Sequence, residues 1–205
     1  MQHRRLGMVD FGSTFESMKA FTAKRTQTTE DEIWLLQHPP VYTQGLSGKA
    51  EHVLDAGDIP VIHIDRGGQV TYHGPGQWIA YVLYDLRRAG MTIRELVERL
   101  EKAVVNLLAD YGVAAYGDPG ARGVYVQGRK IAALGLKVSR GRSYHGLSLN
   151  VDMDLSPFAG INPCGYEGLE VTSVARELGA DQPVDFSELG ERLLYHLEQA
   201  LPAKA

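Results

Sequence analysis

The sequence predicts an α+β fold in which a mixed, mainly antiparallel sheet is flanked by helices. Short apolar segments that end at glycine or proline indicate strands, and segments with cap signals or 3–4 apolar spacing indicate helices. No internal repeat, low-complexity stretch or Ser/Pro-rich linker separates these segments. We therefore expect one domain that spans residues 1–205.

The first half of the chain combines one helix with three strands. Ser13 and Glu16 have the S-x-x-E spacing of a capping box, which predicts a helix over residues 13–27. Apolar runs bounded by turn-forming residues predict strands at residues 32–36, 61–65 and 77–83. The last run is apolar on both faces, as is typical of a central strand.

The strongest helix signal covers residues 92–111. Thr92 and Glu95 form a second capping box, and Gly112 ends the segment. The apolar residues recur at helical spacing, at Ile93, Leu96, Val97, Leu100, Val104, Leu107, Leu108 and Tyr111. We expect this face to pack on the sheet. The solvent side should carry Glu98, Arg99 and Lys102.

The second half begins with a hairpin of strands 123–126 and 131–138, which turns at residues 127–129. The remaining elements are a strand at 144–151, a loop at 152–171 and helices at 173–178 and 187–201. Structureless loops of this length are uncommon in compact domains and are often functional. The loop is therefore the first place to look for a site.

Composition indicates a soluble, intracellular protein. The net charge is −4, from 25 acidic and 21 basic residues, which argues against a general nucleic-acid binder. No apolar run approaches the roughly 18 residues of a membrane span, and no secretory signal follows Met1. A single cysteine suits a reducing compartment. We expect a cytoplasmic protein that contacts no membrane.

One stretch departs from the acidic average. Residues 129–142, called the basic stretch below, carry five basic side chains and no acidic one. Such a stretch suits an acidic partner protein or a phosphate-bearing ligand. It equally suits a hairpin whose exposed face is charged for solubility, and charge alone does not decide between them.

The lone cysteine lies in the turn-forming string Asn162-Pro163-Cys164-Gly165, inside the long loop. A free cysteine is commonly a small buried hydrophobe. A turn between proline and glycine instead presents the thiol, because Gly165 lets a ligand approach closely. A cysteine thiol is mostly protonated at neutral pH, so a nucleophilic cysteine needs a histidine or a cation beside it.

Three residues are candidates to assist the thiol, although their spacing pairs none of them with it. Lys130 precedes an apolar strand, and His73 and His145 lie in glycine-containing segments. Each is equally compatible with a structural or solvated role. The glycine-rich segment 66–77 can bring backbone N–H groups to a ligand. It matches neither a dinucleotide-binding fingerprint nor a Walker loop.

Four segments together resemble the octanoyltransferase family of lipoate biosynthesis. They are RGGQVTYHGPGQ at 66–77, GRKIAALG at 128–135, HGLSLNV at 145–151 and NPCG at 162–165. The resemblance extends from about residue 32 to residue 172, with the segments in the family's order and spacing. It implies the fold of biotin and lipoate protein ligases.

The resemblance implies transfer of an octanoyl group from acyl carrier protein to a protein lysine, without metal, nucleotide or other cofactor. The acceptors would be lipoyl domains of 2-oxoacid dehydrogenases and the glycine cleavage H protein. Cys164 corresponds to the family's acyl-thioester nucleophile and Lys130 to the lysine that stabilises its thiolate. The segments that line the acyl and substrate site correspond to Arg66, Gly67, Gly68, Gln69, Val70, Thr71, Tyr72, His73, Ala133, Leu134, Gly135, Gly146, Leu147 and Ser148.

Three other activities compete with this hypothesis. An ATP-dependent lipoate or biotin-type protein ligase on the same fold would activate a free acid as an adenylate. A cysteine thioesterase would form the same acyl-enzyme and pass the acyl group to water. An inactive scaffold that binds the carrier protein would show no acylation.

Overall fold

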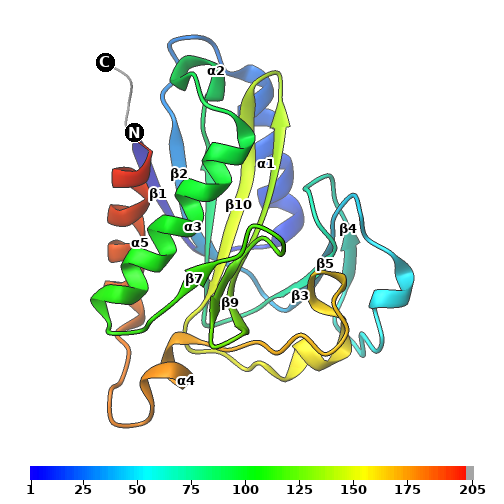
Figure 1. Cartoon of the computed structure of the whole chain (residues 1–205). Helices are drawn as coiled ribbons and strands as arrows, with labels where there is room; N and C mark the ends of the chain where they lie inside the picture. Colours follow the sequence, from blue (N-terminus) through cyan, green and yellow to red (C-terminus); the bar gives the residue numbers. More distant parts are fainter. Residues whose placement is uncertain (202–205) are drawn as a thin grey trace.

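The computed structural model describes residues 1–201 and contains two sheets (Figure 1). The larger has the strand order β1-β2-β6-β10-β9-β8-β7, and the smaller has the order β4-β3-β5. The bounds are β1 Gln2–Met8, β2 Glu32–Gln37, β3 Val41–Gln44, β4 Val61–His63, β5 Val70–His73, β6 Gln77–Leu83, β7 Tyr116–Gly117, β8 Val124–Val126, β9 Arg129–Ser139 and β10 Arg142–Asn150. The predicted mixed, mainly antiparallel sheet is confirmed, since only β1 with β2 and β3 with β4 pair in parallel.

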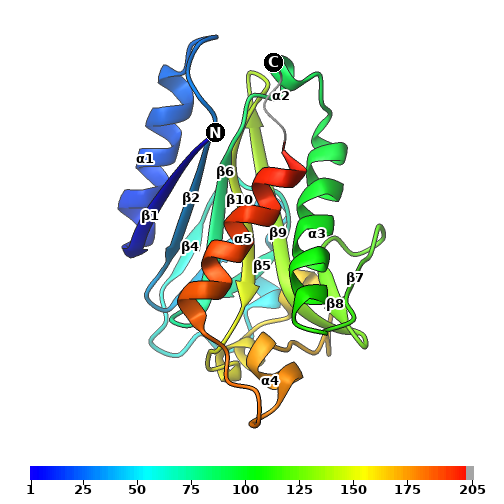
Figure 2. The same ribbon diagram turned by 90° about the vertical axis from the view of Figure 1, so that its left-hand side faces the viewer.

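Helices cover both faces of the larger sheet. One face carries α3 (Ile93–Asp110) and α5 (Phe186–Ala200), which lie side by side, while α1 (Phe11–Lys24) lies on the opposite face (Figure 2). The short helices α2 (Leu86–Ala89) and α4 (Val174–Leu178) lie at opposite ends of the sheet. Among the described residues no helix has both the length and the apolar character needed to cross a membrane.

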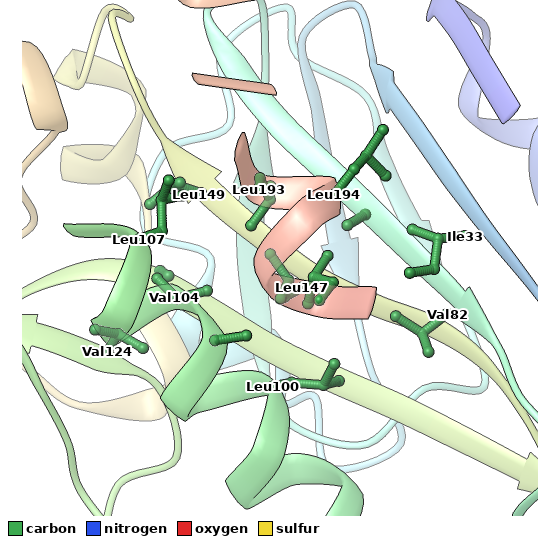
Figure 3. Packing of buried hydrophobic residues seen from close by; sticks show 14 of the residues in the cluster. Ile33, Val82, Leu100, Val104, Leu107, Val124, Leu147, Leu149, Leu193 and Leu194 are labelled. Carbon is green, nitrogen blue, oxygen red and sulfur yellow. The ribbon is translucent and has the colours of Figure 1, made fainter. Parts of the chain in front are cut away.

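The main core lies between the larger sheet and the α3/α5 layer. Leu100, Val104 and Leu107 of α3 meet Leu193 and Leu194 of α5 over strand residues that include Leu147 and Leu149 (Figure 3). The expected face of α3 is confirmed, because Leu96, Leu100 and Leu107 are buried and Glu98, Arg99 and Lys102 are exposed. Ile93 was wrongly included: it begins the helix outside the packed stripe and is 47% exposed.

The first helix begins earlier than its predicted capping box. Its N-cap is Asp10, whose carboxylate accepts a hydrogen bond from the backbone N–H of Ser13 at 2.9 Å. Ser13 therefore lies inside the helix, with Glu16 exposed one turn further on. An S-x-x-E string predicts a cap only where the serine backbone is extended, and here the extended residue is Asp10.

Several strands carry no local signal that predicts them. The exposed β1 becomes a strand because its backbone pairs in parallel with the buried β2, and α1 makes the crossover between them. The short β5 lies within the glycine-rich segment and pairs with β3. The other neighbour of β3 is β4, and the three strands form the smaller sheet. The predicted structureless loop 152–171 contains two 3₁₀ turns, at Ser156–Gly160 and Pro163–Gly165.

The basic stretch does not form one surface. Arg129 pairs with Glu177 at 3.0 Å, whereas Arg142 lies at the other end of the hairpin and pairs with Asp85 at 3.3 Å. Lys130 is buried. Strand geometry directs successive side chains to opposite faces, so a run of charges along a hairpin is divided between faces. The interpretation as a single docking patch is therefore not supported.

Candidate active site

Cys164 lies at the middle of the 3₁₀ turn Pro163–Gly165 in a left-handed backbone conformation, with φ 58° and ψ 15°. This conformation is uncommon for a residue with a Cβ and is found repeatedly at functional sites. Hydrogen bonds hold the turn: the N–H of Asn162 donates to the His52 carbonyl at 2.9 Å, and the N–H of Gly165 donates to the Asn162 carbonyl at 2.9 Å. The thiol is half-buried.

The amine of Lys130 lies against this thiol. Its Nζ is 2.9 Å from Cys164 Sγ and 3.2 Å from the Arg122 carbonyl oxygen. The ammonium also lies 5.1 Å from the centre of the Tyr125 ring, in cation–π contact. The fold thus brings together the lysine and the cysteine that the family resemblance named, although they are 34 residues apart in sequence.

A β-bulge directs Lys130 toward the site. Tyr125 pairs with Lys130 but Val124 pairs with Ala132, so Ile131 is an extra residue on β9. In a regular strand Lys130 would share the face of Ala132, which belongs to the main core. The extra residue reverses the alternation and places the ammonium on the opposite face. The site thus depends on one irregularity in the sheet.

The charge state of Lys130 is held by its surroundings. Burial lowers the pKa of its ammonium, whereas the charge of Cys164 and the hydrogen bond to it raise the pKa. The raising effects are larger, so the pKa of Lys130 lies above its ordinary value. Lysine is only 3% exposed here. A buried ammonium without a partner would be costly, and the contacts with Cys164 and with the Arg122 carbonyl stabilise the charged lysine.

A cavity of about 260 Å³ opens beside the pair, between the two sheets. Most residues that the family resemblance assigned to the substrate site line it. They are Arg66, Gly68, Gln69, Val70, Thr71, His73, Ala133, Leu134, Gly135, Gly146, Leu147 and Ser148. Two of the assigned residues do not: Tyr72 packs on Tyr42 and Phe158 behind the smaller sheet, and Gly67 bonds through its backbone to Leu136.

Sequence reasoning missed part of the lining. Phe11, Ile64, Ile79 and Tyr81 border the cavity but lie outside the recognised motifs. The alternation of Ile79 and Tyr81 within strand 77–83 could have placed them on one face. No local signal pointed to Phe11. Residues near the thiol were also missed, namely Ser47, Gly120, Ala121, Arg122 and Tyr166.

His73 borders the cavity as a neutral ring. Burial lowers its pKa to about 3. Gln77 donates its amide to the Tyr72 carbonyl, so its Oε1 accepts a hydrogen bond from His73 Nδ1 at 2.8 Å. The other ring nitrogen lies 3.3 Å from the hydroxyl of Thr43. Both nitrogens are thus occupied by the protein.

The Tyr81 hydroxyl and the Nε2 atom of His145 also form hydrogen bonds with protein partners. Burial lowers the pKa of His145 to about 4, and its Nε2 donates to Asp65 at 3.1 Å. The Tyr81 hydroxyl donates to Nε2 of His38 at 2.7 Å, while the other nitrogen of His38 donates to the Val9 carbonyl. The Tyr81 hydroxyl and His145 Nε2 therefore face protein partners, which makes this part of the cavity more suitable for a hydrocarbon chain.

Arg66 supplies a second cation at the cavity. Its guanidinium is buried and donates to the Thr43 and Gly67 carbonyls at 2.6 and 2.9 Å. Burial lowers its pKa to about 10, so it remains charged at neutral pH. A Cβ on Gly135 would lie 2.8 Å from Arg66 Cδ, so glycine is required there for the arginine to pack on β9. Within residues 1–201 no group of His, Cys, Asp and Glu side chains could hold a metal ion.

Comparison with known proteins shows the family of this chain. The model of the lipoyl protein ligase A/B catalytic domain matches residues 12–198. An octanoyltransferase of Stutzerimonas stutzeri is 55% identical over 198 residues, which are 97% of this chain and 89% of that protein.

Solved structures show the fold. A bi-partite lipoate protein ligase from Thermoplasma acidophilum superimposes with a TM-score of 0.73 at 19% identity, over 98% of this chain and 84% of that one. A biotin protein ligase from Aquifex aeolicus gives 0.59 at 12% identity, over 98% and 70%. The expected biotin and lipoate protein ligase fold is confirmed. The chain belongs to the octanoyltransferase family and is an acyltransferase.

Proposed function

We propose that this cytoplasmic enzyme takes an octanoyl group from acyl carrier protein onto Cys164 and passes it to a lysine of a lipoyl-bearing domain. The acceptors are the lipoyl domains of 2-oxoacid dehydrogenases and the glycine cleavage H protein. The observation that carries the proposal is the 2.9 Å contact between Lys130 Nζ and Cys164 Sγ at the mouth of a largely apolar cavity. Membership of the octanoyltransferase family supports the acyl group chosen.

In the first step the Cys164 thiolate attacks the carbonyl carbon of the carrier thioester. The carbonyl carbon forms a bond to Sγ, and its bond to the carrier sulfur breaks. The departing thiolate takes a proton from the Lys130 ammonium, which is the only acid that the described structure places in contact with Sγ. The step exchanges one thioester for another and leaves Lys130 neutral.

In the second step the neutral amine of the acceptor lysine attacks the enzyme thioester. A carbon–nitrogen bond forms, the bond to Sγ breaks, and neutral Lys130 takes the extra proton from the amine. Cys164 returns to thiolate and Lys130 to ammonium, so the starting state is restored. An amide is more stable than a thioester, and the transfer needs no ATP.

The cavity accounts for recognition of the acyl chain. Each buried methylene contributes about 0.8 kcal/mol, so an eight-carbon tail gains several kcal/mol of binding. His73 and His145 border the chain as neutral rings, because burial lowers the pKa of each well below neutral pH. Binding of the chain therefore requires no desolvation of a charged histidine.

Mass spectrometry of the intact protein tests the proposal. The enzyme is mixed with octanoyl carrier protein, without acceptor or ATP, and one added octanoyl mass on Cys164 is expected. Cys164→Ser should keep the fold and carry no acyl mass, because a serine hydroxyl stays protonated beside a cation. Absence of acylation together with ATP-dependent use of free octanoate would establish a ligase. Release of free octanoate without an acceptor would establish a thioesterase.

A further inference from the structure

One residue that borders the cavity from outside the recognised motifs is Phe11. Phe11 is the first residue of α1, is 3% exposed and borders the cavity. Its ring lies 5.1 Å from that of His38 and 6.1 Å from that of Phe15, measured between centroids. The Asp10 cap fixes the first turn of the helix, so the ring has a defined position.

The order of the strands places Phe11 far from the thiol. Lys130, which contacts Cys164, belongs to β9, and the next strands across the sheet are β10, β6 and β2. His38, against which Phe11 packs, directly follows β2. Neighbouring strands lie about 4.8 Å apart, so three spacings separate the two sites by roughly 14 Å. The cavity therefore runs across the sheet, with the nucleophile at one end.

Several residues between these ends offer apolar surface to a hydrocarbon chain. Ile79 of β6 and Ile64 contribute aliphatic carbon, and the Tyr81 hydroxyl and His145 Nε2 bond to protein partners. At this end of the cavity Phe11 forms a small cluster with Val41 and Ile64. A longer chain would have to displace the Phe11 ring to enter that cluster.

We propose that Phe11 is the residue that sets the maximum acyl chain length accepted by this enzyme. This inference rests on the proposed function, because it takes the cavity to hold the acyl chain of the Cys164 thioester. Substituents smaller than the ring should extend the cavity into the space next to His38. An engineered cavity of roughly 150 Å³ accommodates a benzene ring, so removal of this ring should add a substantial volume to the roughly 260 Å³ present.

The test is a competition between carrier proteins loaded with six-, eight-, ten- and twelve-carbon acyl chains. Wild-type enzyme, Phe11→Ala, Phe11→Leu and Phe11→Trp each receive the equimolar mixture, and the masses on Cys164 are read after a single turnover. One methylene in a new apolar site is worth about fourfold in binding, so two further methylenes in Phe11→Ala should raise the ten- to eight-carbon ratio by about 15-fold. Phe11→Trp should shift the distribution toward six carbons.

Phe15→Ala is the matched control. Phe15 stacks on Phe11 and on His145 but does not border the cavity, so its removal costs core packing without lengthening the site. Its acyl distribution should match wild type. If Phe11→Ala does not fold, Phe11→Leu and Phe11→Trp still give opposite expected shifts. Unchanged distributions in the folded Phe11 variants would refute the inference alone, whereas no acyl mass in wild type would refute the proposed function.

Discussion

At the scale of single residues, the pairing of one ammonium with one thiol is the central feature of the site. Lys130 reaches Cys164 only because Ile131 is an extra residue on β9. The thiol is held in a left-handed turn whose neighbours are proline and glycine. Both partners therefore occupy irregular backbone, where the position of a side chain depends on tertiary contacts rather than on local sequence period.

Removal of the ammonium should make the thiol less reactive. Lys130→Ala deletes the positive charge 2.9 Å from Sγ that stabilises an anionic nucleophile, so alkylation by iodoacetamide at pH 7 should slow by about tenfold or more. The rate is measured by mass spectrometry of the intact protein. Lys137→Ala on the same strand is the control and should alkylate at the wild-type rate. Equal rates for both variants would show that the ammonium does not activate the thiol.

His145 should make stability depend on pH. Its pKa is about 4 in the folded protein and close to 6.5 in the unfolded chain, so the unfolded chain takes up the proton first as pH falls. The stabilisation is complete above about pH 6.5 and is lost as pH falls toward 4, by up to about 1.4 kcal/mol per pH unit.

Urea unfolding at pH 7, 6 and 5 measures this effect. His145→Asn tolerates the left-handed backbone at φ 60° but cannot titrate in this range. The free energy of unfolding of this variant should decline less steeply with falling pH than that of wild type. Parallel declines for the two proteins would mean that His145 is not buried as a neutral ring.

At the scale of elements, the N-terminal caps of α1 and α3 show where the sequence prediction fails and where it holds. The backbone N–H of Ser13 donates to the carboxylate of Asp10, so Asp10 begins α1 and the serine does not. In α3 the predicted box is confirmed: Thr92 accepts from the Glu95 N–H at 3.2 Å, and Glu95 accepts from the Thr92 N–H at 2.7 Å. The same sequence pattern is thus a cap in one helix and an interior turn in the other.

Alanine substitution at the two positions tests which residue caps α1. Asp10→Ala should lower the free energy of unfolding by about 1 kcal/mol, the usual cost of losing an N-cap. Ser13→Ala should change it by less than about 0.5 kcal/mol, as is typical of exposed positions inside a helix. Chemical denaturation of both variants measures the difference. A larger loss from Ser13→Ala than from Asp10→Ala would restore the capping box that the sequence suggested.

At the scale of the whole molecule, the proposed reaction brings two protein substrates to one cavity. Cys164 and Lys130 line this cavity together with residues of both sheets. If Cys164 carries the acyl group, the donor can leave before the acceptor arrives. The same entrance can then admit the two substrates in turn.

This arrangement predicts ping-pong kinetics. Initial rates measured at several concentrations of octanoyl carrier protein and of a lipoyl domain should give parallel double-reciprocal lines. Acyl-enzyme freed of donor should transfer its group to the acceptor without ATP. Lines that intersect, together with wild-type turnover by Cys164→Ser, would indicate direct transfer between the two substrates bound at the same time.

Features that depend on residues close together in the chain could be predicted from the sequence alone. The apolar period of α3 and its Thr92 cap, the hairpin of β8 and β9, and the turn that presents Cys164 were all predicted from local pattern. The motif resemblance added the family and named the lysine and the cysteine. The structure contains these features because helix periodicity, caps and turns depend on local interactions.

Features that depend on contacts between distant segments could be seen only in the three-dimensional structure. The parallel pairing of β1, the bulge that turns Lys130 toward Cys164, and the place of Phe11 at the end of the cavity all require segments far apart in sequence to pack together. A bulge shifts the face of a side chain by one residue, and strand alternation in the sequence gives no warning of it. Cys164 was visible in the sequence as a candidate nucleophile, but the shape of the site that surrounds it followed from packing.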